Sequence, residues 1–282
     1  RLWQTVIATM INTNHRHNVG MVIARGESLG RLDEYSLERA EFVVFKPEQR
    51  ADLLDFLARR PTRYSIHNPL FVPPDYPENP LLACIVDEDE DRRAKAVALM
   101  IENIGLAAEL GAEFVVVHVQ RPEQFAGVPS GFDAAAAMSS ACRSLDSIME
   151  KSRAANVPVL IENLMDNSLF YSEEQYLDLF ARYPGLGFCL DIGHLDMDSR
   201  RFGIDLYAFV DALAPYTREV HIQNSAGTEN STAHRPWKIP VHPSQTPAAG
   251  WCDIDRILSA IRAASPDCAF NFEFRPEKEH TH

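Results

Sequence analysis

Eight short segments rich in β-branched and aromatic residues recur along the chain, and longer helical patterns separate them. Their apolar runs are nearly continuous, which is typical of parallel strands covered on both faces. The strand candidates are 3–8, 41–46, 62–67, 113–119, 158–162, 186–191, 218–223 and 269–274. Helical patterns lie between them, among others at 48–59, 91–110, 133–155, 173–182 and 254–264. This alternation predicts the α/β class and a closed (β/α)8 barrel, the TIM barrel.

An open, doubly wound sheet is the competing arrangement, but no GxGxxG motif follows the first strand candidate. The chain of 282 residues has the length of one barrel, and no linker or low-complexity tract divides it. We therefore expect a single domain over residues 1–276 and a polar tail over 277–282.

Composition limits the possible partners and location. The net charge is −13 and no basic stripe is present, so a nucleic-acid partner is not expected. No apolar run reaches membrane-spanning length, so no membrane partner is expected either. The five cysteines are scattered without a CxxC pair, which favours reduced thiols and a cytoplasmic protein. The sequence begins with Arg1, which leaves open a leader removed before it. The outer helices of barrels often pair between subunits, so a homo-oligomer is also possible.

Two connections, 68–91 and 224–252, are unusually long and both follow the carboxyl end of a predicted strand. The first is proline-rich and ends in an acidic run, whereas the second is polar and carries two tryptophans, Trp237 and Trp251. Long loops in compact domains often bind ligands or cover active sites, and barrel enzymes place their active sites at this face.

Six of the predicted strands end in a residue that can bind a metal. These residues are His67, His118, Glu162, Asp191, His221 and Glu273, and His194 follows in the turn after the sixth strand. Because all parallel strands of a barrel finish at one rim, residues far apart in sequence are expected to meet there.

Each of these residues also has a purely structural interpretation. His67 or His118 alone is more simply a core histidine with satisfied hydrogen bonds. Glu162, Asp191 and Glu273 are harder to explain, because three converging carboxylates repel one another unless a cation lies between them. Oxygen ligands with one imidazole, from His221, suit Mn, Mg, Co or Zn. The sequence therefore predicts one divalent metal ion held by this quartet.

The motifs IEN, LDIGH, EVHIQNS and FEF at successive strand ends resemble those of the xylose isomerase-like barrel superfamily. The resemblance extends in order over the whole chain, although only the strand ends match specifically. This superfamily includes sugar isomerases and epimerases and DNA repair enzymes of the endonuclease IV type. The resemblance implies that Glu162, Asp191, His221 and Glu273 bind the metal, and that His194 contacts the substrate or a further metal.

The resemblance first implies an isomerase or epimerase acting on a small sugar or polyol. A metal ion polarises a carbonyl, and proton removal and return at the neighbouring carbon then need an acid/base group. By resemblance, Glu162 and Glu273 are this pair, Asp191 and His221 are ligands only, and His194 contacts a hydroxyl. Arg235, in the long loop after His221, either orients the substrate or is an ordinary surface arginine.

The alternative is a metal-dependent phosphodiester hydrolase like endonuclease IV, with two or three zinc ions. By resemblance, such enzymes add two histidines from earlier strands to the metal ligands, and His67 and His118 match this requirement. The Asp-x-His motif expected in the loop after the seventh strand is incomplete, because His234 there has no aspartate two residues before it. A metal-dependent sugar lyase or dehydratase is a third interpretation. A barrel that binds a ligand without turnover is a fourth, and the complete quartet argues against it.

Overall fold

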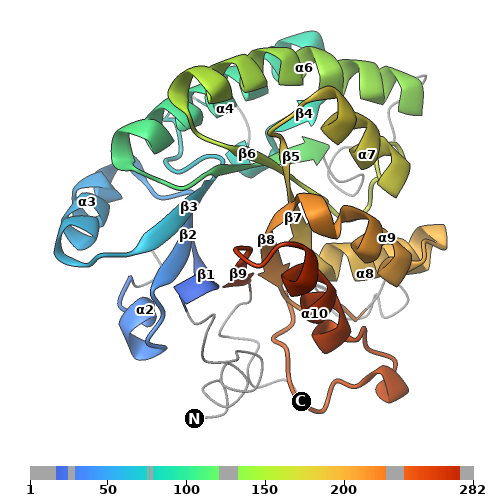
Figure 1. Ribbon diagram of the computed structural model, residues 1–282. Helices are drawn as coiled ribbons and strands as arrows, with labels where there is room; N and C mark the ends of the chain where they lie inside the picture. The colour runs from blue at the N-terminus through green and yellow to red at the C-terminus, as the bar shows by residue number, and fades with distance from the viewer. Residues whose placement is uncertain are drawn as a thin grey trace.

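The computed structural model describes residues 17–24, 29–74, 76, 79–120, 133–226 and 238–273. Eight parallel strands form the barrel, with helices around its outside (Figure 1). The strands are β1 (Val19–Ala24), β2 (Arg39–Val43), β3 (Arg63–His67), β5 (Val115–Gln120), β6 (Val159–Glu162), β7 (Gly187–Asp191), β8 (Thr217–Ile222) and β9 (Ala269–Phe272). Pairing of β3 with β5 closes the ring, so the predicted TIM barrel is confirmed.

The strands are apolar because both of their faces are covered. Every residue of β2, β6, β7 and β9 is buried, and strand residues such as Ile23, Val117 and Phe188 are not exposed at all. Burial of such side chains is the main stabilising contribution to the fold, at about 1.5–3 kcal/mol each. The polar residues buried within these strands therefore stand out against an apolar background.

The helices agree closely with the sequence patterns where these were predicted. They are α2 (Arg31–Glu34), α3 (Arg50–Arg59), α4 (Glu90–Leu110), α6 (Ala134–Ala155), α7 (Glu173–Arg182), α8 (Ile192–Phe202), α9 (Leu206–Leu213) and α10 (Ile254–Ala264). Short 3-10 turns are η2 (Pro47–Gln49), η3 (Pro80–Leu82), η4 (Ala214–Tyr216) and η5 (Pro247–Ala249). In α4 the carboxylate of Asp89 caps the first turn, and Gly111 at φ +77° ends the helix.

The strand predictions were less accurate at the amino-terminal end. The candidate at 3–8 lies outside the described residues, and β1 is instead formed by Val19–Ala24. The second strand was predicted at 41–46 but spans Arg39–Val43, because Val44 adopts a positive φ of 48° that interrupts the extended chain.

The first long loop contains structure that its composition did not indicate. A short strand, β4 (Cys84–Val86), pairs with the end of β5 outside the ring of eight. The segment that follows Asp191 was predicted as a turn but is helix α8, which begins at the next residue. Among the described residues, no helix has the length and apolar character needed to cross a bilayer.

Candidate functional site

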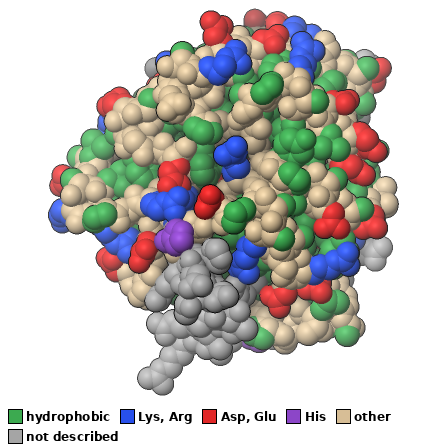
Figure 2. Space-filling view, in the orientation of Figure 1, with side chains coloured by type: hydrophobic (Ala, Val, Ile, Leu, Met, Phe, Trp, Pro, Cys, Tyr) green, Lys and Arg blue, Asp and Glu red, His purple; other side chains and the backbone are tan. Residues whose placement is uncertain are grey.

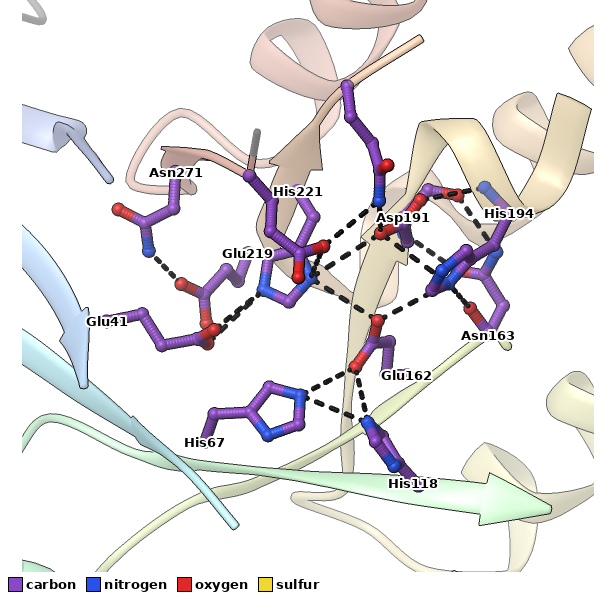
Figure 3. A network of polar contacts seen from close by, with 12 residues as sticks. Glu41, His67, His118, Glu162, Asn163, Asp191, His194, Glu219, His221 and Asn271 are labelled. Atoms are coloured by element: carbon purple, nitrogen blue, oxygen red, sulfur yellow. Dashed lines mark hydrogen bonds and ion pairs between the residues drawn. The ribbon is translucent and has the colours of Figure 1, made fainter. Parts of the chain in front are cut away.

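The carboxyl ends of β6, β7, β8 and β9 bring the predicted quartet together inside the barrel rim (Figure 3). Glu162 and Asp191 are the last residues of β6 and β7, His221 lies near the end of β8, and Glu273 directly follows β9. Potential ligand atoms of these four residues all lie within 4.8 Å of one another. The barrel thus converts four separate sequence positions into one cluster.

Asp191 has two separate tasks, one for each carboxylate oxygen. Its Oδ1 caps helix α8 by accepting a hydrogen bond from the backbone amide of His194 at 2.8 Å. Its Oδ2 points into the cluster, 3.8 Å from Nδ1 of His221. Asn163 holds the Asp191 backbone in place from both sides, with its side-chain oxygen 2.8 Å from the amide and its side-chain nitrogen 3.0 Å from the carbonyl oxygen. The carboxylate orientation is therefore fixed by β6, β7 and α8 together.

His221 lies at the centre of the quartet. Its Nδ1 is 3.4 Å from Oε1 of Glu162, 3.7 Å from Oε2 of Glu273 and 3.8 Å from Oδ2 of Asp191. This nitrogen is buried and has no hydrogen-bond partner among the described residues. A buried nitrogen without a partner is unfavourable in a folded protein unless it is protonated or binds an ion.

The cluster is electrostatically coupled. Burial acts to raise the pKa of Glu162, but the charge of His221 and hydrogen bonds from neighbouring histidines outweigh it and hold that pKa well below its usual value. Burial likewise opposes ionisation of Glu273, yet the ion pair with Lys238 and the charge of His221 lower the Glu273 pKa to about 2. These two carboxylates are therefore anionic near neutral pH and attract a cation.

The donor set fits a divalent metal ion. Ions such as Mg²⁺ and Zn²⁺ take oxygen and imidazole ligands at about 2.0–2.2 Å, so opposite ligands lie roughly 4 Å apart. The spacing within the quartet is close to that value, and two buried carboxylates, with a third that is partly buried, are stabilised by such a charge. Together with the unpartnered Nδ1, these features make Glu162, Asp191, His221 and Glu273 the residues able to hold the ion.

His67 and His118 form a second group that shares Glu162 with the quartet. Nε2 of His67 and Nε2 of His118 lie 3.0 and 3.3 Å from Oε2 of Glu162, and 3.1 Å from each other. Nδ1 of His118 lies 2.7 Å from the carbonyl oxygen of Leu81, in the loop after β3. This contact suits an Nδ1–H donor and leaves an Nε2 lone pair facing inward. The group has the composition of a second metal site.

His194 reaches the same cavity from the first turn of α8. Its Nδ1 lies 3.0 Å from the carbonyl oxygen of Asn163 and 3.5 Å from carboxylate oxygens of both Glu162 and Asp191. The structure thus brings together every predicted site residue that it describes. His234 and Arg235 lie outside the described residues.

Two side chains at the site were not singled out from the sequence. The side-chain nitrogen of Gln223 donates to Asp191 and, at 3.0 Å, to Oε2 of Glu273. Lys238, returning from the second long loop at φ +59°, forms an ion pair with Oε1 of Glu273, and its backbone amide donates to Gln223. Gly193 makes room for Gln223, since a Cβ there would lie 2.9 Å from its side chain. Gln223 could have been noticed within EVHIQNS, whereas Lys238 carried no sequence signal.

Comparisons with known proteins agree with this geometry. Residues 35–281 match the family model of the xylose isomerase-like TIM barrel. No curated protein matches the sequence significantly.

Solved structures resemble the fold at low sequence identity. A D-tagatose 3-epimerase-like protein is 17% identical with a TM-score of 0.68, over 93% of this chain and 92% of the other. A 3-keto-D-glucoside 4-epimerase from E. coli is 11% identical with a TM-score of 0.65, over 92% of both chains. A xylose isomerase-like TIM barrel protein from Mycobacterium smegmatis, in complex with magnesium, is 15% identical with a TM-score of 0.61, over 93% and 91%. At these identities the likeness establishes a shared fold.

Proposed function

Because the chain belongs to the xylose isomerase-like TIM barrel family, we propose that it is a divalent-metal-dependent isomerase or epimerase of a small sugar or polyol. The observation that carries the proposal is the convergence of Glu162 and Glu273 with Asp191 and His221 on one buried point. Structural neighbours whose names describe sugar epimerases support the choice of substrate class.

In this proposal a divalent ion held by the quartet would supply Lewis-acid polarisation of the substrate carbonyl, which lowers the pKa of the adjacent C–H bond. Asp191 and His221 serve only to hold the ion. One carboxylate, Glu162 or Glu273, removes the proton from the carbon next to the carbonyl, and the electron pair of that bond moves toward the carbonyl oxygen as an enediolate forms. The other carboxylate returns a proton to the opposite face for epimerisation. Proton transfer by positioned groups of this kind typically contributes about 10²- to 10⁴-fold in rate.

The remaining side chains of the cavity orient the substrate. His194 lies close to both Glu162 and Asp191, which suits a contact with a substrate hydroxyl next to the reacting carbon. Lys238 provides a cation beside Glu273. A residue of the loop before it, Arg235, is proposed as a further substrate contact.

The runner-up is a zinc-dependent phosphodiester hydrolase, and the His67–His118–Glu162 group is the observation that favours it. Two features count against it. The loop after β8 lacks the aspartate of the hydrolase motif. On the face that Figure 2 shows, the described Lys and Arg side chains are scattered among acidic and apolar ones and form no continuous basic track of the kind a DNA backbone needs. A lyase or dehydratase would use the same proton removal, followed by loss of water.

The test measures metal content and solvent proton exchange together. The protein is purified without chelator, its metal content is determined, and it is incubated in D₂O with ketoses and keto-inositols. The proposal predicts about one Mn, Mg, Co or Zn ion per chain and deuterium incorporated next to the carbonyl of a turned-over sugar. Two or three zinc ions with cleavage of an abasic-site DNA duplex would instead establish the hydrolase.

A further inference from the structure

Two buried acidic residues lie inside the barrel, beside the metal-ligand quartet. Glu41 on β2 and Glu219 on β8 each have no exposed surface. Barrel interiors are usually filled by bulky apolar side chains, and a buried carboxylate is costly unless it is bonded. The partners of these two residues therefore indicate why the interior keeps them.

Glu41 forms a hydrogen bond with the proposed metal ligand His221, at the ring nitrogen that faces away from the quartet. Its Oε1 and Oε2 lie 3.1 and 3.2 Å from Nε2 of His221, and the two residues are 0% and 1% exposed. Figure 3 shows the His221 ring between Glu41 on one side and the quartet carboxylates on the other. The ring therefore uses Nε2 toward Glu41 and presents Nδ1, its unpartnered nitrogen, to the quartet.

An imidazole can bind a metal through either nitrogen, and the hydrogen bond at the other nitrogen decides which. An Nε2–H group donating to a carboxylate leaves the Nδ1 lone pair free and makes it a stronger donor. It also prevents rotation of the ring, because a flipped ring would lose the bond to the buried carboxylate.

We propose that Glu41 is a positioning residue of the metal site, which accepts the Nε2–H hydrogen bond of His221 and fixes Nδ1 as the metal-binding atom. This inference rests on the proposed function, because it takes the quartet as the metal site. It adds a residue from β2 to a site whose four proposed ligands all come from the carboxyl ends of β6 to β9.

Glu219 is the matched control. It is as deeply buried as Glu41, but its Oε1 accepts hydrogen bonds from the hydroxyl of Ser65, at 3.2 Å, and from the side-chain nitrogen of Asn271. Register places Glu41 opposite Ser65, whose hydroxyl bonds Glu219, so both acids belong to the same part of the interior. Burial raises the pKa of Glu219 well above its usual value, and its carboxyl group also hydrogen-bonds Glu41. Glu219→Gln therefore keeps a neutral hydrogen-bonding side chain at this position. Of the two acids, Glu41 is the one for which the described residues show a hydrogen bond with Nε2 of His221.

The experiment compares wild type, Glu41→Gln, Glu41→Leu and Glu219→Gln by titration of the metal-free proteins with Co²⁺. The absorption bands of bound Co²⁺ and competition with a chelator give the dissociation constant. We expect the Glu41 variants to bind Co²⁺ about 10- to 100-fold more weakly, the usual cost of losing such a partner, with changed absorption bands. The Co²⁺ dissociation constant of Glu219→Gln should stay within about 3-fold of the wild-type value, because the hydrogen bond between His221 and Glu41 is preserved.

A second measurement is made on the wild type and does not depend on the Glu41 variants folding. The His221→Gln variant serves only to assign the signal. The protein carries histidine labelled with ¹⁵N at Nδ1 or at Nε2 and is loaded with one equivalent of ¹¹³Cd²⁺. Coupling between cadmium and Nδ1 of a single histidine, absent in the His221→Gln variant, is expected. Coupling through Nε2 of His221 would overturn the proposal.

The outcomes separate the two levels of inference. If wild type binds no Co²⁺, the metal site itself is wrong. If wild type binds Co²⁺ and Glu41→Gln binds it equally well, the metal site stands and the role of Glu41 is refuted. An equal loss in Glu41→Gln and Glu219→Gln would also refute it, because the effect would then come from any change to the acidic side chains of the barrel interior.

Discussion

The two groups of side chains that share Glu162 are built differently. On one side, Asp191 and Glu273 lie around the unpartnered Nδ1 of His221, and Lys238 compensates only part of the carboxylate charge. On the other side, His67 and His118 face each other through their Nε2 atoms, 3.1 Å apart, with backbone carbonyl oxygens near their Nδ1 atoms.

This difference concerns charge. The carboxylate side has excess negative charge and needs a cation to be stable, whereas the histidine side can be stabilised by its own hydrogen bonds to Glu162. Burial lowers the pKa of His118, which favours its neutral form. The comparison therefore predicts a strong requirement for an ion on the carboxylate side and a weaker one on the histidine side.

The largest effect is expected for Glu162→Ala, because this residue belongs to both groups. Loss of an acid/base group and ligand should lower turnover by about 10³-fold and abolish metal retention. Steady-state kinetics and metal analysis test this, with Glu102→Ala, an exposed acid on α4, as the control. Normal metal content in Glu162→Ala would contradict the assignment of the quartet.

The histidine side should respond less. For His67→Gln and His118→Gln we expect about one bound ion per chain and a loss of activity of roughly 10-fold, as for residues that contact a ligand without binding the ion. Metal analysis after gel filtration distinguishes the two sides. If wild type holds two zinc ions and each variant loses one, the histidine group is a metal site and the hydrolase interpretation gains support.

The sequence predicted which strand-end residues converge better than it predicted the start of the barrel. The strand-end residues could be identified because an ionisable residue stands at or near the end of an otherwise apolar run. The barrel topology then implies that these residues meet. They are Glu162, Asp191, His221 and Glu273. The β1 segment was misplaced because two apolar runs, 3–8 and 19–24, precede the second strand, and periodicity alone cannot choose between them.

Residues that act through another side chain were missed for a different reason. Glu41 appeared to open a strand, at the end of the barrel away from the site, because the predicted strand began two residues too late. Lys238 follows a polar loop whose path the sequence does not define, so its contact with Glu273 emerges only from the fold. Local sequence patterns identify residues at strand ends. Contacts across the barrel depend on strand register and loop path, which only the folded structure defines.

Lys238 offers a sharper test of the carboxylate side, since its ion pair with Glu273 would compete with the proposed metal ion for that carboxylate. Removing its charge in Lys238→Met should increase metal affinity by about 5-fold, corresponding to roughly 1 kcal/mol of Coulomb energy. A purely structural lysine would lower metal affinity when replaced. Chelator competition measures the change, and Lys95→Met, at an exposed position of α4, is the control.

The same ion pair should make a small, pH-dependent contribution to the stability of the metal-free protein. Burial alone would raise the Glu273 pKa, but Lys238 and His221 bring it from 4.5 to about 2. A carboxyl group with a depressed pKa stabilises the fold above its unfolded pKa, and this stabilisation is lost as the pH falls through the folded value. The free energy of unfolding of wild type should therefore exceed that of Lys238→Met at pH 6, and the difference should shrink as the pH falls below about 4.5.

Urea unfolding in the presence of chelator, at pH values from 6 to about 3, measures this difference in the free energy of unfolding. A difference that stays constant over this range would show that Lys238 stabilises the loop by packing rather than by its charge on the carboxylate side.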